Sequence, residues 1–77
     1  MQINLLAFGQ VASVTGNNFS LNENVADTND LMAVLQNKYP ALAGMKYALA
    51  VNKKMIHENT ALSDNVTIAL LPPFSGG

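Results

Sequence analysis

Cysteine is missing from this sequence of 77 residues. Its absence excludes disulfide bonds, thiolate catalysis, iron–sulfur clusters and cysteine-ligated zinc. Histidine occurs once, as His57, so a metal site or catalytic pair built on two histidines is excluded as well. A chain of this size makes one domain, and without disulfides it depends on good packing to fold.

Charge is also scarce, because charged residues make up 12% of the chain, about half the usual share. The net charge is −1, and all four basic residues are lysines. Binding to nucleic acid requires a basic face, and clamping phosphate commonly uses arginine, so we expect no nucleic-acid partner. The apolar share of 49% favours a folded domain over disorder.

Long apolar runs are absent too, and none approaches the roughly 18 residues that span a membrane. The first six residues, Met-Gln-Ile-Asn-Leu-Leu, lack the basic start of a signal peptide. We therefore expect a cytoplasmic protein with no membrane contact.

What is present is a pattern of short strands around one helix. Acids and a threonine before a helical apolar pattern predict a main helix over about 28–38, which Pro40 ends. Period-two alternation predicts four to five strands, over residues 2–8, 19–22, 47–51, 55–56 and 66–71. Asn65 favours a left-handed turn before the last strand. This order predicts an α+β domain over residues 1–71, with one helix packed on one sheet.

Both faces of the first strand are apolar near its end, which predicts that the chain covers the strand on both sides. The alternative is that one face stays open, with Leu6, Phe8 and Leu71 forming an exposed apolar patch. Exposed patches of that kind mark interfaces, so these three residues are the candidate partner surface. Segments 9–18 and 40–45 are the candidates for covering them.

The sequence predicts an extended tail over residues 72–77. Pro72 and Pro73 stop the last strand and hold the chain extended. Phe74 is the only bulky side chain that follows, before Ser75, Gly76 and Gly77. Because glycine has no Cβ, such a tail can thread a narrow channel and present its terminal carboxylate inside a partner.

The sequence resembles the MoaD/ThiS family of sulfur carriers, within the β-grasp, ubiquitin-like superfamily. Within that family it is most similar to the small subunits of molybdopterin synthases. The resemblance rests on the Ala7–Val11 segment, the helix opening at Thr28, Val51-Asn52, and the stretch from Leu62 through the Pro-Pro-Phe-Ser-Gly-Gly ending. It implies a β-grasp fold with a mixed sheet.

The resemblance also implies the chemistry. An E1-like enzyme consumes ATP to adenylate Gly77, and a persulfide sulfur then converts it to a thiocarboxylate. The tail, from Pro72 to Gly76, inserts into the large subunit of the synthase. The sulfur passes to cyclic pyranopterin monophosphate and forms the molybdopterin dithiolene. The carrier itself binds no cofactor or metal, its catalytic groups belong to the large subunit, and two small and two large subunits are expected to assemble.

Other functions remain open at this point. A carrier for thiamine synthesis or tRNA thiolation, and a ubiquitin-like modifier joined to lysines, would use the same Gly-Gly ending. A plain binding module would not need it. Among the other polar residues, His57 and the lysines 46, 53 and 54 are expected on the surface. The acids Asp27 and Asp30 are explained as residues of the helix N-terminus.

Overall fold

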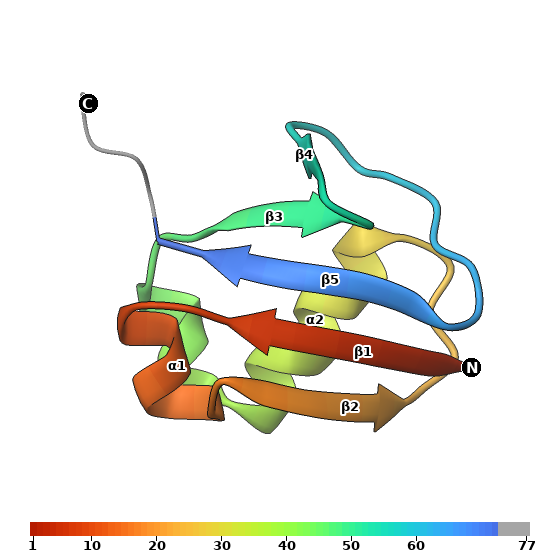
Figure 1. Ribbon diagram of the computed structural model, residues 1–77. Helices are drawn as coiled ribbons and strands as arrows, with labels where there is room; N and C mark the ends of the chain where they lie inside the picture. The colour runs from red at the N-terminus through yellow and green to blue at the C-terminus, as the bar shows by residue number, and fades with distance from the viewer. Residues whose placement is uncertain (73–77) are drawn as a thin grey trace.

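The computed structural model describes residues 1–72 as one five-stranded sheet with the helices on one face (Figure 1). The elements in chain order are β1 (Gln2–Ala7), α1 (Gln10–Thr15), β2 (Asn18–Asn22), α2 (Thr28–Lys38), the 3-10 helix η1 (Pro40–Gly44), β3 (Ala48–Val51), β4 (Lys54–Ile56) and β5 (Val66–Leu71). The strand order is β2-β1-β5-β3-β4. Strands β1 and β5 are parallel, and the other neighbours are antiparallel. The predicted β-grasp fold, with a mixed sheet and one main helix, is confirmed.

The centre of the core is the parallel pair of β1 and β5. Alternate residues of both strands face the helices and are buried, in the register Ile3–Val66, Leu5–Ile68 and Ala7–Leu70. From the helical side, Leu31 and Leu35 of α2 complete the core together with Val11 of α1 and Leu42 of η1. The packing that this small chain needs is therefore concentrated on one face of its sheet.

Helix α2 begins and ends where the sequence predicts. The Asp27 carboxylate accepts a hydrogen bond from the Asp30 N–H at 3.0 Å, and Asp30 accepts one from the Ala26 N–H at 3.1 Å. The two acids therefore serve the helix N-terminus, as expected. At the other end, Tyr39 has left the helical conformation with φ −128°, as the residue before Pro40 should.

Two turns orient the ends of the strands. Asn65 has φ 63°, which confirms the left-handed turn predicted before β5. Between β3 and β4, Asn52 and Lys53 have φ 49° and 73°. The backbone N–H of Asn52 donates to the Thr67 carbonyl at 2.8 Å, and its side-chain Oδ1 accepts from the Thr67 N–H at 3.0 Å. These two bonds fasten the β3–β4 turn to β5.

The expectation that β1 is covered on both sides is wrong. Strand β1 ends at Ala7, and Phe8 just beyond it is 45% exposed. The segments that might have covered it, α1 and η1, insert Val11 and Leu42 into the same core as α2. The second face of the sheet therefore remains open. Among the described residues, 1–72, no helix is long and apolar enough to cross a membrane.

Candidate functional site

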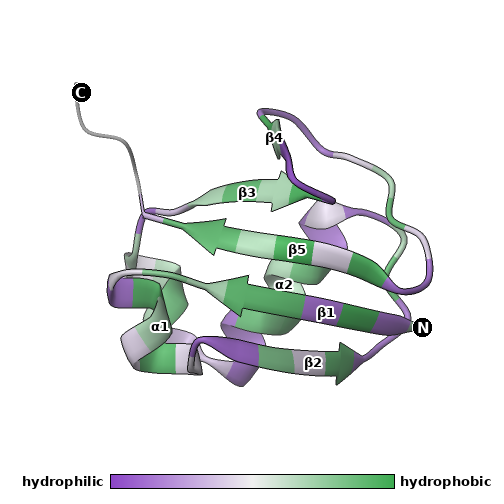
Figure 2. Cartoon of the chain, in the orientation of Figure 1, coloured by the Kyte–Doolittle hydropathy of each residue, from purple (hydrophilic) through white to green (hydrophobic). Residues whose placement is uncertain are grey.

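The open face of the sheet divides into a polar and an apolar half. Near the start of β1, Gln2 and Asn4 pair with Asn22 and Ser20 of β2, and Asn4 pairs with Thr67 of β5. In Figure 2, β1 alternates between hydrophilic and hydrophobic residues there and is continuously hydrophobic at its other end. Polar side chains therefore occupy the half of the open face farther from Pro72.

The apolar half is built from two rows that cross the strands. Strand register places Leu6 beside Ala69, Ala69 beside Ala50, and Ala50 beside Met55, a row across four strands. A second row pairs Leu71 with Ala48. Phe8 extends this row, because its N–H donates to the Leu70 carbonyl at 3.1 Å and so continues the β1–β5 pairing. We call these seven residues the apolar open face: Leu6, Phe8, Ala48, Ala50, Met55, Ala69 and Leu71. Ala50 is itself buried, at 5% exposed, and the other six are partly or well exposed.

The structure thus brings together the three residues that the sequence suggested as a partner surface. Leu6 and Leu71 are half-buried, and Phe8 and Met55 are the exposed large hydrophobic residues of the described chain. Sequence analysis missed Met55 and the three alanines. Only strand register shows that they share a face with Leu6. An apolar surface without a covering element is typical of an interaction site.

The chain leaves the sheet beside this surface. Strands β1 and β5 are parallel, so their carboxyl ends lie at the same edge, with Phe8 and Gly9 next to Leu71 and Pro72. Pro72, the last residue that the structure describes, is exposed. Five predicted tail residues lie outside the described residues: Pro73, Phe74, Ser75, Gly76 and Gly77.

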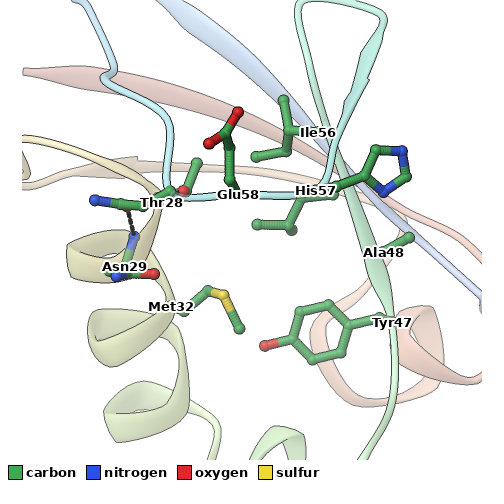
Figure 3. A pocket seen from close by; sticks show the side chains of 10 residues that line it. Thr28, Asn29, Met32, Tyr47, Ala48, Ile56, His57 and Glu58 are labelled. Carbon is green, nitrogen blue, oxygen red and sulfur yellow. Dashed lines mark hydrogen bonds between the residues drawn. The ribbon is translucent and has the colours of Figure 1, made fainter.

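A separate groove of about 400 Å³ lies between the start of α2, the start of β3 and the segment after β4 (Figure 3). The side chains of Met32 and Tyr47 meet in it, and His57 and Glu58 lie at its border. The Tyr47 hydroxyl is buried without a hydrogen-bond partner among the described residues. Ala48 of the apolar open face lines its edge, whereas Leu6, Phe8, Leu71 and Pro72, the described residues predicted to bind a partner, do not line it.

The remaining polar candidates lie on the surface. His57 and the three lysines at 46, 53 and 54 are exposed, as expected. Within residues 1–72, no group of three or more histidine, aspartate or glutamate side chains is placed to hold a metal ion. The described residues thus present an exposed apolar surface, and the last strand ends beside it.

Known proteins resemble this chain in sequence and in architecture. The chain is 37% identical, over 84 aligned positions covering all of both proteins, to the molybdopterin synthase sulfur carrier subunit of Chlamydomonas reinhardtii. It is 34% identical to a chain in the complex of subunits 1 and 2 of the molybdopterin-converting factor from Helicobacter pylori 26695, with full coverage of both chains and a TM-score of 0.71.

A third relative shares the fold alone. SAMP1 from Haloferax volcanii superposes with a TM-score of 0.80 over all of both chains, at 21% sequence identity. The ThiS family matches residues 5–77, which include the second half of β1, all of β5, the apolar open face and the Gly-Gly ending. On this match, and on the full-length identity to a curated relative, the chain belongs to the ThiS family.

Proposed function

We propose that this chain is the sulfur-carrier subunit of a molybdopterin synthase. The observation that carries the proposal is its 37% identity, over the full length of both proteins, to a subunit of that name. The Pro-Pro-Phe-Ser-Gly-Gly ending, which the family match includes, supports it further.

In this proposal Gly77 is the carrier of the sulfur. A free carboxylate is a poor acyl donor, so an E1-like enzyme first uses ATP to form the Gly77 acyl-adenylate. The outer sulfur of an enzyme persulfide then displaces AMP and forms an acyl disulfide. A thiol cleaves this disulfide, which releases the Gly77 thiocarboxylate and leaves a new disulfide on the sulfur donor. We call the thiocarboxylate form the charged carrier. It gives this sulfur to cyclic pyranopterin monophosphate. Because the dithiolene of molybdopterin contains two sulfur atoms, two charged carriers are consumed for each product molecule.

The domain that precedes the tail holds the carrier against its partner. The H. pylori relative was solved as a complex of subunits 1 and 2, which supports a large catalytic subunit as the partner of this chain. We assign the docking surface to the apolar open face, where Phe8 and Met55 are exposed. Residues 72–76 then enter the large subunit, which supplies the acid–base groups and the pterin pocket. Two small and two large subunits complete the assembly.

A reconstituted reaction tests the proposal. The chain is charged by an E1-like enzyme with ATP and a persulfide donor, and then mixed with a molybdopterin synthase large subunit and cyclic pyranopterin monophosphate. We expect molybdopterin to form, with the thiocarboxylate consumed in a ratio of two to one. A charged chain that binds the large subunit but yields no dithiolene would contradict the proposal.

Two related functions use the same ending and differ in the acceptor. A carrier for thiamine synthesis or tRNA thiolation would deliver its sulfur to another enzyme, and a modifier would become joined to lysines. The resemblance to SAMP1, at 21% identity, shows the fold and does not favour modification. The charged chain can be mixed with all of these acceptors at once. The acceptor that receives the sulfur, or the chain itself, then distinguishes these functions from the proposed one.

A further inference from the structure

Gly9 and Pro72 face each other where β1 and β5 leave the sheet. The parallel register runs to the pair Ala7–Leu70, and the Phe8 N–H adds a hydrogen bond of 3.1 Å to the Leu70 carbonyl. Two residues further on, the chain from β1 turns towards α1 at Gly9, and the chain from β5 departs through Pro72. The two departing backbones are therefore held side by side by the sheet.

A side chain at position 9 would crowd the Pro72 ring. A Cβ placed on Gly9 would lie 3.3 Å from the Pro72 Cβ and 3.4 Å from its Cγ. Carbon atoms in favourable contact are about 3.5–4.0 Å apart. The proline ring cannot rotate away as a flexible side chain would, because it is closed on its own backbone. A Cβ at position 9 would therefore push the Pro72 ring by a few tenths of an ångström, and glycine leaves the ring in place.

We propose that Gly9 is a positioning residue for sulfur transfer, because it seats the Pro72 ring and so sets the direction in which the chain leaves β5. This inference rests on the proposed function. Proline has φ fixed near −65°, so fixing its ring also fixes most of the local backbone direction. Gly9 follows Phe8 of the apolar open face. Its contact with Pro72 therefore orients the departing chain relative to a partner docked on that face.

Gly9 also has a purely local role that must be separated from this one. Its φ of 65° and ψ of −141° start helix α1, and a residue with a Cβ is strained in that conformation wherever it lies. Gly16, at the other end of the same helix, has φ 90° and no atom within 4 Å of a Cβ placed on it. Gly9→Ala and Gly16→Ala therefore share backbone strain, and only Gly9→Ala disturbs Pro72.

The first experiment tests the contact itself and does not depend on sulfur transfer. In NMR spectra of the full chain, we expect nuclear Overhauser effects between the Gly9 Hα protons and the Pro72 ring protons. They should be unchanged in Gly16→Ala, whereas in Gly9→Ala the chemical shifts of the Pro72 ring protons should change because the added Cβ displaces the ring. A folded wild-type chain without this contact would overturn the proposal, whatever the chain does with sulfur.

The second experiment measures sulfur transfer by the charged variants to the large subunit, at matched concentrations of folded protein. We expect Gly9→Ala to lower kcat about tenfold to a hundredfold relative to Gly16→Ala, since small misplacements of reacting groups have effects of that size. The KM for the charged carrier should change less, because the docking surface is intact. Pro72→Gly should lower kcat similarly, and this variant serves if Gly9→Ala does not fold.

A double variant gives the sharpest comparison. In the Pro72→Gly background, adding Gly9→Ala should change kcat by no more than about twofold, because the contact is already lost. Equal kcat losses in the two glycine variants, or fully independent effects of Gly9→Ala and Pro72→Gly, would overturn the positioning role while leaving the proposed function intact. A wild-type charged chain that transfers no sulfur would overturn both.

Discussion

Among single residues, Gly77 carries the chemistry proposed for the chain. Adding one methyl group as Gly77→Ala should leave folding unchanged, since residue 77 follows the domain. It should block charging or sulfur transfer, because a Cβ obstructs a channel shaped for glycine. Thiocarboxylate formation and molybdopterin yield are the measurements.

Gly44→Ala is the matched control for this change. Gly44 is exposed in η1, and a Cβ placed on it meets no atom within 4 Å. We expect Gly44→Ala to charge and transfer like the wild type. Normal transfer by Gly77→Ala would contradict the carrier mechanism.

Asp27 links the stability of the domain to pH. The hydrogen bond from the Asp30 N–H, followed by one from the Asn59 side chain, holds the pKa of the Asp27 carboxyl below its ordinary value. The ionised form is thus favoured in the folded state. Its contribution to stability is present above the ordinary pKa of about 3.9 and is lost as the pH falls through the lower, folded-state pKa.

Asp27→Asn isolates this charge effect, because asparagine is also a good N-cap. We expect the variant to have a lower urea midpoint than the wild type at pH 7. The difference between the two midpoints should shrink as the pH is lowered below about 4. A difference that stays constant down to pH 2 would show that the carboxylate is not the responsible group.

At the scale of elements, Thr28 joins the start of α2 to the segment that follows β4. It is 2% exposed, its hydroxyl accepts from the Thr60 N–H at 3.0 Å, and it donates to Asn59 Oδ1 at 3.2 Å. Thr28→Val keeps the shape and removes both bonds, leaving a part-buried N–H unpaired. We expect a loss of about 1–3 kcal/mol in the free energy of unfolding.

Chemical denaturation measures this loss, and Thr28→Ser is the control. Serine keeps the hydroxyl and deletes one methyl group, so it should retain most of the stability that Thr28→Val loses. If serine and valine destabilised the domain equally, the hydrogen bonds would not be the cause.

The elements show which features a sequence can predict. Helix α2 was predicted with its correct bounds because local signals, the Asp27 cap and Pro40, mark both ends. Asn65 was predicted to be left-handed because asparagine tolerates that conformation. The coverage of β1 was predicted wrongly, because apolar residues on a second face look alike whether a helix of the same chain or a partner covers them.

For the whole molecule, the apolar open face depends on strand register. Leu6, Phe8 and Leu71 were suggested by their own strands, whereas Met55 and Ala69 join them only through pairings across the sheet. The contact of Gly9 with Pro72 likewise joins two ends of the chain that are 63 residues apart (72 minus 9). Such contacts arise from tertiary arrangement and leave no local signal in the sequence.

The same face gives a prediction for assembly. Phe8→Ser and Met55→Ser change exposed side chains, so each should alter the stability of the isolated chain by only about 0.5 kcal/mol. At the centre of an interface, truncation of a large apolar side chain weakens binding by about 1–3 kcal/mol. Titration calorimetry with the large subunit measures the affinity.

The polar half of the open face supplies the control for this prediction. Ser20 is exposed on β2 and faces the same side as Asn4, its partner in the sheet. We expect Ser20→Ala to bind the large subunit with wild-type affinity. Full affinity in both Phe8→Ser and Met55→Ser would show that the docking surface lies elsewhere.

The central claim is that the chain carries sulfur on Gly77. The intact mass of the full chain tests this claim most directly. The full chain is incubated with an E1-like enzyme, ATP and a persulfide donor, and its intact mass is then measured. We expect a fraction heavier by the mass difference between sulfur and oxygen, with fragmentation placing the exchange on Gly77. A chain whose Gly77 remains an unmodified carboxylate, when a related carrier in the same mixture is charged, would contradict the account.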